Sequence, residues 1–332
     1  MQDSRIKVGV FGAGHLGKIH IQQWLQVPDA IFVGFYDPDD SQAQSAISQY
    51  DVKRYDSVEQ LIDACDALDI VSTTTTHYEI AKQCLTKCKH LFIEKPLAHS
   101  IDEAAELVQL VKEANVKCQV GHVERYNPAY LALGEQPLQP MFIEAHRLAQ
   151  FNPRGTDVSV ILDLMIHDID IVMHLVKSPV RRISASGVAV ISETTDIANA
   201  RIEFDNGCVA NLTSSRISLK KMRKMRLFQR DAYIGVDFLE KKTEVVRLTD
   251  DTAKRGMLDI PIQMGNGEQK LISVQMPEVE DTNAIRMELS EFAQSILTGR
   301  PVRVSVYDGF QAMDVAHQIL KKMSQHRELH NV

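Results

Sequence analysis

Short apolar runs alternate with helical patterns over the first 120 residues of the chain. The runs cover residues 6–11, 30–36, 69–72, 90–93 and 117–120, and a helical pattern follows the first of them at 16–27. Strands separated by helices indicate βαβ crossovers and a doubly wound parallel sheet. In such a sheet, ligands bind at the carboxyl ends of the strands.

The pattern changes after about residue 122. β-rich runs recur with few helices between them, at 141–146, 182–191, 198–204, 208–214, 225–229, 232–236 and 244–248, and the DNG sequence at 205–207 predicts a hairpin turn. Helical patterns cover 161–176, 283–297 and 309–324. We therefore predict an α/β domain over residues 1–122, followed by an α+β domain with an open, mostly antiparallel sheet over residues 123–332.

Composition narrows the class of protein. The 332 residues are 44% hydrophobic and 24% charged, as in a folded globular protein, and the formal net charge of -7 gives no general attraction to nucleic acid or to anionic lipid. No uninterrupted apolar stretch is long enough to cross a membrane, and the N-terminal residues lack the pattern of a secretory signal. Five scattered cysteines without CxxC spacing suit a reducing compartment, so we expect a cytoplasmic protein.

A glycine motif joins the first predicted strand to the first predicted helix. Gly12, Gly14 and Gly17 have G-x-G-x-x-G spacing, which permits a tight turn, close approach of a pyrophosphate and close packing of helix on strand. Asp37 ends the second predicted strand, where its carboxylate can accept hydrogen bonds from both ribose hydroxyls and would repel a 2′-phosphate. The motif therefore predicts an NAD site, with NADP disfavoured; the alternative is a glycine turn beside an acidic loop.

Polar residues also follow two later strands. Thr73 to Thr76 and His77 come after one strand, and Glu94, Lys95 and Pro96 come after the next. A lysine beside a buried strand end is unusual unless it has a partner, so Lys95 is a candidate site residue. The alternative is an exposed loop lysine.

Four titratable residues interrupt the apolar run ILDLMIHDIDIVMHL at 161–175. On a regular α-helix, Asp163, His167, Asp170 and His174 would fall within about 60° of one another. Such a stripe can transfer protons, bind a metal or hold paired polar groups with no chemistry. A metal-dependent hydrolase or epimerase is one rival, but the dinucleotide motif would then lack a purpose, and we expect no metal.

Together these motifs resemble the Gfo/Idh/MocA family of oxidoreductases. The resemblance rests on GAGHLG at 12–17, the strand end at Asp37, EKP at 94–96, the D-x-x-x-H-x-x-D pattern of residues 163–170 and VSVYDG at 304–309. It implies a Rossmann domain that binds NAD(P), a C-terminal domain whose open sheet often forms the dimer contact, and oxidation of a secondary sugar or polyol alcohol. VGHVERYNPAY at 120–130, with the segments 161–172 and 216–238, is similar to the branch that includes UDP-N-acetylglucosamine 3-dehydrogenases.

The resemblance also implies roles for individual residues. Lys95 would lie near cofactor and substrate, His167 would be the proton-transfer residue, and Asp163 would lie beside it. From its place one turn before His167, Asp163 could orient the imidazole or tune its pKa. The sequence leaves open whether Lys95 or His167 is the base. In the family's TPT-type loop, which corresponds to Thr73 to Thr76, this sequence lacks the usual proline. The expected cofactor-binding residues are Gly12, Gly14, His15, Leu16, Gly17, Asp37, Thr73, Thr74, His77, Glu94 and Lys95, and the expected substrate residues are Lys95, Arg125, Tyr126, Asn127, Asp163, His167 and Asp170.

Three questions of function remain open at this point. The substrate is expected to be UDP-N-acetylglucosamine or a related UDP-sugar oxidised at C3, with an inositol or a free sugar as the alternative, or the chain is a non-enzymatic NAD sensor. The basic run from Lys220 to Arg230 most simply forms a solvated or subunit-interface face; it could instead hold a diphosphate. We expect a homodimer or homotetramer formed through the C-terminal sheet, and no nucleic-acid or membrane partner.

Overall fold

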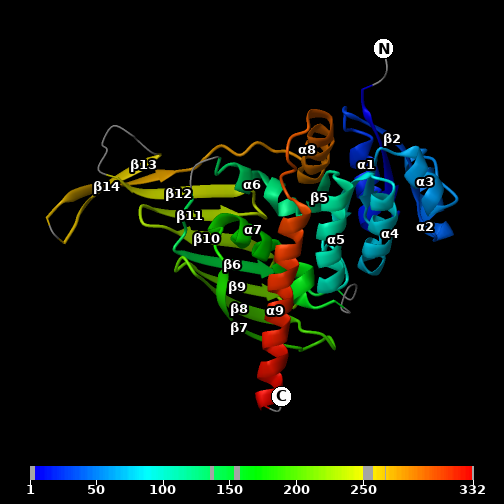
Figure 1. The fold of residues 1–332 in the computed structure, drawn as a ribbon. Helices are drawn as coiled ribbons and strands as arrows, with labels where there is room; N and C mark the ends of the chain where they lie inside the picture. The colour runs from blue at the N-terminus through cyan, green and yellow to red at the C-terminus, as the bar shows by residue number, and fades with distance from the viewer. Residues whose placement is uncertain (1–3, 135–137, 153–157, 250–256, 266, 331–332) are drawn as a thin grey trace. The chain divides into compact units, whose positions relative to one another are not determined.

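The computed structural model describes residues 4–134, 138–152, 158–249, 257–265 and 267–330, with side chains up to residue 325. Within them the chain forms two compact units (Figure 1). The first contains residues up to 126 together with 283–314, and the second contains 127–282 together with the residues from 315 onward. The chain therefore returns to the first unit at a segment that the sequence analysis grouped with the second domain.

The first unit is a Rossmann domain built on a five-stranded parallel sheet of order β2-β1-β3-β4-β5. Its strands are β1 (Ile6–Phe11), β2 (Ala30–Tyr36), β3 (Ala67–Ile70), β4 (His90–Glu94) and β5 (Cys118–Gly121). The helices are α1 (His15–Trp24), α2 (Asp40–Tyr50), α3 (Val58–Ala64), α4 (Thr74–Thr86) and α5 (Ile101–Ala114), followed by the 3-10 turn η1 (Val123–Tyr126). The doubly wound sheet predicted from the sequence is confirmed.

Local sequence explains where these helices begin. The Asp39 side chain accepts hydrogen bonds from Ser41 N and Gln42 N and so caps α2. Ser100 and Glu103 form a reciprocal capping box at the start of α5. The strands are buried on both faces, as expected of a parallel sheet covered by helices.

Helix α8 (Ala284–Thr298) completes the first unit. Asn283 caps it, and its buried residues Leu289, Phe292 and Ala293 join the core formed by β1 and α1. Phe292 meets Phe92 of β4 edge to face, with ring centroids 5.9 Å apart. The helix is therefore packed into the unit that holds the glycine motif.

The second unit is built on a nine-stranded sheet of order β13-β14-β12-β11-β10-β6-β9-β8-β7. All neighbouring pairs are antiparallel except β6 with β9. The strands are β6 (Phe142–Leu148), β7 (Val180–Val188), β8 (Ile197–Phe204), β9 (Val209–Ser215), β10 (Met222–Phe228), β11 (Ala232–Asp237), β12 (Lys242–Thr249), β13 (Leu258–Gln263) and β14 (Gln269–Gln275). The expected open, mostly antiparallel sheet is confirmed, and β13 and β14 are strands that the sequence analysis did not identify.

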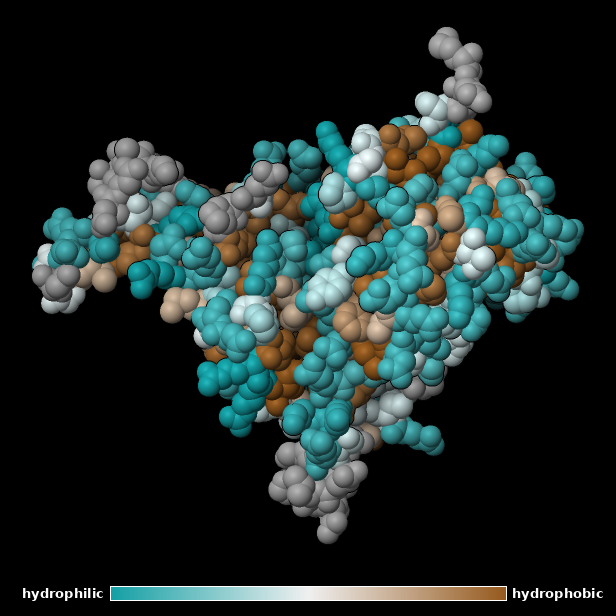
Figure 2. Space-filling model, in the orientation of Figure 1, coloured by the Kyte–Doolittle hydropathy of each residue, from teal (hydrophilic) through white to brown (hydrophobic). Residues whose placement is uncertain are grey.

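Helices cover one face of this sheet. Besides the short α6 (Pro128–Leu131), the unit contains the π-helical turn η2 (Ile161–Met165), which leads into α7 (Ile166–Val176), and α7 packs on β6 and β9. The last helix, α9 (Val306–His330), runs across the boundary between the two units. Among the helices that the structure describes, none has an apolar stretch of the length needed to span a membrane. On the face drawn in Figure 2, hydrophilic and hydrophobic residues are interspersed.

The helix predicted at 161–176 is therefore not regular over its whole length. Ile166 N donates to Ile161 O, five residues back, so the turn that contains Asp163 is wider than an α-helical turn. The angular spread calculated for a regular helix does not apply to Asp163, although His167, Asp170 and His174 all lie on α7. Single π-turns of this kind occur frequently at functional sites.

Candidate functional site

The glycine turn after β1 has the geometry of an anion cradle. Gly12 has φ +100°, and a Cβ there would lie 2.9 Å from Ser72 backbone atoms. A Cβ on Gly17 would lie 2.1 Å from Gly12 O, whereas a Cβ on Gly14 would meet no atom of the described part of the chain within 4 Å. Gly14 is also the N-cap residue of α1 and supplies no side-chain hydrogen bond there. The turn therefore leaves room at the helix N-terminus for a pyrophosphate, and the residues fit a dinucleotide.

Asp37 lies beside this turn and is nearly buried. Its carboxylate accepts Ala13 N at 2.6 Å and Asp39 N at 2.8 Å. Arg54 donates to the Asp37 carbonyl at 2.8 Å and to the Asp40 carboxylate at 2.7 Å. The end of β2 thus carries a fixed negative charge next to the glycine turn.

His77 connects two of the predicted strand ends. Its ring nitrogens lie 3.1 Å from Ser72 O and 3.1 Å from Pro96 O. Burial lowers the pKa of His77, so the neutral ring donates to only one of the two carbonyls. Thr73 and Thr74 begin α4 in the same loop, while His15 and Leu16 open α1 with exposed side chains.

Glu94 and Lys95 end β4 in different environments. The Glu94 carboxylate is buried, accepts Lys95 N at 3.0 Å and lies 3.2 Å from His20 Nε2. A Cβ on Gly121 would lie 2.6 Å from Glu94 Oε1, so the glycine makes room for this carboxylate. Lys95 is half-buried.

The polar stripe of the second unit lies on the η2–α7 segment. Asp163 and His167 are half-buried, Asp170 is buried, and His174 meets the Tyr130 ring edge to face at 6.5 Å. Asp163 belongs to the π-helical turn and His167 to the first turn of α7. The segment therefore places a carboxylate one turn before an imidazole. In such a pair the carboxylate can orient the imidazole, and the imidazole can transfer a proton.

A buried ion pair next to His167 was missed by the sequence analysis. Arg147 of β6 donates to both Asp168 carboxylate oxygens, at 3.1 and 2.7 Å. The two residues are 21 positions apart in the chain, and nothing in the local pattern marks them as partners.

Arg125, Tyr126 and Asn127 have partners of their own. Arg125 and Tyr126 are buried in the first unit, where Arg125 lies 3.8 Å from Asp308 and the Arg303 guanidinium lies over the Tyr126 ring. Asn127 belongs to the second unit; it caps α6 and donates to Phe238 O at 3.1 Å. Contact of these residues with substrate stays a prediction.

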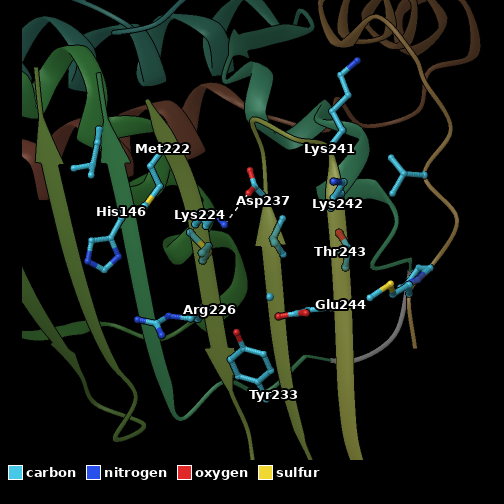
Figure 3. A pocket seen from close by; sticks show the side chains of 17 residues that line it. His146, Met222, Lys224, Arg226, Tyr233, Asp237, Lys241, Lys242, Thr243 and Glu244 are labelled. Carbon is cyan, nitrogen blue, oxygen red and sulfur yellow. Dashed lines mark ion pairs between the residues drawn. The ribbon is translucent and has the colours of Figure 1, made fainter. Parts of the chain in front are cut away.

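A groove of about 890 Å³ lies on the other face of the nine-stranded sheet (Figure 3). His146 and Leu148 of β6 line it, whereas Arg147 between them points to α7. Two members of the basic run, Lys224 and Arg226, also line it and pair with Asp237 and Glu144. This groove is therefore separate from the face that carries His167.

Comparison with known proteins assigns the chain to a family. Residues 6–122 match the oxidoreductase family with an NAD-binding Rossmann fold, and residues 139–233 match the GFO/IDH/MocA C-terminal domain. The UDP-N-acetylglucosamine 3-dehydrogenase of Acidithiobacillus ferrooxidans is 31% identical over 315 residues, which cover 95% of this chain and 96% of that protein. The chain belongs to the Gfo/Idh/MocA family. The resemblance stated from the sequence is thus confirmed, and so is the assignment to oxidoreductases that act on CH–OH groups.

A solved structure and a second relative are also similar to this chain over almost its whole length. A solved structure of the A. ferrooxidans dehydrogenase has a TM-score of 0.86 with this chain at 29% identity, covering 96% of this chain and 98% of that one. The myo-inositol 2-dehydrogenase of Thermotoga maritima is 23% identical over 343 residues, which cover 98% of each protein.

Proposed function

We propose that this chain oxidises a secondary hydroxyl of a UDP-sugar to a ketone with NAD, the substrate being UDP-N-acetylglucosamine or a related UDP-sugar oxidised at C3. The observation that carries the proposal is the 31% identity to a UDP-N-acetylglucosamine 3-dehydrogenase over nearly the whole of both chains. The glycine cradle, Lys95 after β4 and the Asp163 and His167 side chains supply the chemical groups that the reaction needs.

The proposed preference for NAD rests on Asp37. Its fixed carboxylate can accept ribose hydroxyls, and it would repel the 2′-phosphate of NADP. The backbone N–H groups at the start of α1 would bind the pyrophosphate, with Gly14 allowing close approach. His15, Leu16, Thr73, Thr74, His77, Glu94 and Lys95 remain the other proposed cofactor-binding residues. When bound, NAD would accept the hydride that leaves the substrate carbon.

The proposed proton chemistry is assigned to three residues. His167 takes the hydroxyl proton, Asp163 orients its imidazole, and the Lys95 ammonium stabilises the developing alkoxide. Substrate binding is proposed for Asp170 and for Arg125, Tyr126 and Asn127. The buried positions of Arg125 and Tyr126 suit a role in shaping the site more than direct contact.

We further propose a homo-oligomer formed through the uncovered face of the nine-stranded sheet. Phe142, Phe228 and Tyr233 meet there through ring contacts at 6.0 and 5.3 Å, and Phe228 and Leu258 are exposed. An exposed apolar surface of this kind is typical of an interface. All five cysteines lie in the described part of the chain and are free thiols, which supports the proposed cytoplasmic location.

The substrate is tested by NADH formation from NAD with UDP-N-acetylglucosamine, myo-inositol and glucose in parallel, with a carbonyl trap to pull the equilibrium. We expect activity with the UDP-sugar and a loss of about 10²-fold to 10⁴-fold in His167→Ala. Activity only with inositol or glucose would retain the family chemistry and exclude the proposed substrate. NAD binding without turnover of any of the three would favour a sensor.

A further inference from the structure

Four ionisable side chains from four different elements meet in the interior of the first unit. His20 comes from α1, Asp69 from β3, Glu94 from β4 and Glu288 from α8. His20, Asp69 and Glu288 are 0% exposed and Glu94 is 7% exposed. A dry cluster with three carboxyl groups and one imidazole is stable only if bound protons or a metal cation offset the carboxylate charges.

The hydrogen bonds of the cluster fix the orientation of His20. Asp69 Oδ2 accepts the Trp24 indole N–H at 2.7 Å and lies 2.8 Å from His20 Nδ1. An Nδ1–H that donates to Asp69 leaves the Nε2 lone pair of a neutral imidazole facing Glu94 Oε1, 3.2 Å away. Because both of these atoms are electron-rich, a proton or a metal cation must lie between or beside them.

Glu288 is the part of the cluster that a proton on His20 does not explain. Among the residues that the structure describes, neither of its carboxyl oxygens has a hydrogen-bond partner, although the side chain is fully buried. Donor atoms of His20, Glu94 and Glu288 nevertheless lie within 4.8 Å of one another. Native structures rarely leave a buried carboxylate unsatisfied, and a bound cation is one recognised way to satisfy it.

We propose that His20 Nε2, Glu94 and Glu288 bind one divalent transition-metal cation, with Zn²⁺ the best chemical match. Imidazole nitrogen and carboxylate oxygen are ordinary zinc ligands at about 2.0–2.2 Å, so a small adjustment of the side chains closes the three donors around an ion. Asp69, held by Trp24, takes the position of the carboxylate that orients a metal-binding histidine through its other nitrogen.

A cation in this site would stabilise the backbone that carries Lys95. The second oxygen of Glu94 accepts Lys95 N at 3.0 Å, so a cation on Glu94 fixes the end of β4. It also ties α1 and α8 to that strand through His20 and Glu288. The sequence predicted no metal because the three ligands come from widely separated segments without ligand spacing, and the proposal does not depend on which sugar the enzyme oxidises.

The direct test is the metal content of untagged, full-length protein after exhaustive dialysis against metal-free buffer. We expect about one zinc per chain in the wild type and at least a ~10-fold loss in Glu288→Gln and in His20→Asn. Glu291→Gln is the matched control, because it removes a carboxylate one turn further along α8 that pairs with Arg303 near the surface; it should retain the metal.

A second measurement uses only wild-type protein and so tests the proposal even if the variants fail to fold. Wild-type protein is unfolded in guanidinium with a chelator and refolded with Zn²⁺, with Mn²⁺ or with neither. We expect a higher thermal midpoint and restored metal content with Zn²⁺. Metal-free wild-type protein whose thermal midpoint is the same with and without Zn²⁺ would overturn the proposal and leave a proton as the occupant.

Discussion

Arg147 and Asp168 form a two-bond ion pair with side chains only 3% and 4% exposed, and it fastens α7 to strand β6. Asp168 follows His167 directly, so the pair fixes the backbone that carries the proposed proton-transfer residue. Each of the two buried charges is compensated by the other. Removal of one partner therefore leaves an uncompensated buried charge.

Asp168→Asn is predicted to lower the free energy of unfolding by about 3 kcal/mol. Glu144→Gln is the control, because Glu144 lies on β6 like Arg147 but forms a more exposed ion pair, with Arg226 of β10. The control should cost no more than about 1 kcal/mol. Urea denaturation measures both, and equal losses would show that burial of the Arg147 pair is unimportant.

The glycines of the turn should differ in their response to alanine. In Gly14→Ala the new Cβ meets no atom of the described residues within 4 Å, so the fold should be unaffected while NAD affinity falls by about 10-fold or more. In Gly17→Ala the Cβ collides with Gly12 O, so the thermal midpoint should fall as well. Calorimetric NAD titration and thermal unfolding separate the two effects; unchanged affinity in Gly14→Ala would argue against the cradle.

Asp37 is predicted to set the choice between NAD and NADP. Asp37→Asn keeps an oxygen acceptor for Ala13 N but removes the charge, so the ratio of kcat/KM for NAD to that for NADP should drop by about 10-fold or more. Asp39→Asn is the matched control, because asparagine caps α2 as well as aspartate does. A ratio that is the same in all three proteins would mean that selectivity lies elsewhere.

Asp196 should make the second unit sensitive to acid. Burial raises its pKa, but hydrogen bonds from Ser192 and from the Ile191 and Val190 backbone outweigh burial and hold the pKa well below its usual value. Because the folded pKa is depressed, this stabilisation is complete above the unfolded pKa of about 3.9 and is lost as the pH falls through the folded pKa.

The variant Asp196→Asn tests this account. The difference in thermal midpoint between wild type and variant should be largest above about pH 5 and shrink as the pH falls below about 4. Asp205→Asn, an exposed change in the 205–207 turn, should show no such difference. A constant gap between wild type and Asp196→Asn at all pH values would contradict the assignment.

Local patterns were sufficient to predict the Rossmann sheet, the glycine turn and the change to a β-rich second unit. They failed where distant residues meet: Arg147 with Asp168, and His20 with Asp69, Glu94 and Glu288, are paired by topology and not by spacing. The turn around Asp163 was predicted to be regular because periodicity does not reveal an added backbone residue in a π-turn. β13 and β14 were missed because partly exposed strands lack a strong apolar run.

The measurement that tests the central claim most directly is the transfer of deuterium from UDP-N-acetylglucosamine labelled at C3. Mass spectrometry of the reduced cofactor should show the label in NADH formed by the wild type, and no label when the sugar carries deuterium at C4 instead. Label transferred from C4, or NADH formed without label from the C3 substrate, would contradict oxidation at C3.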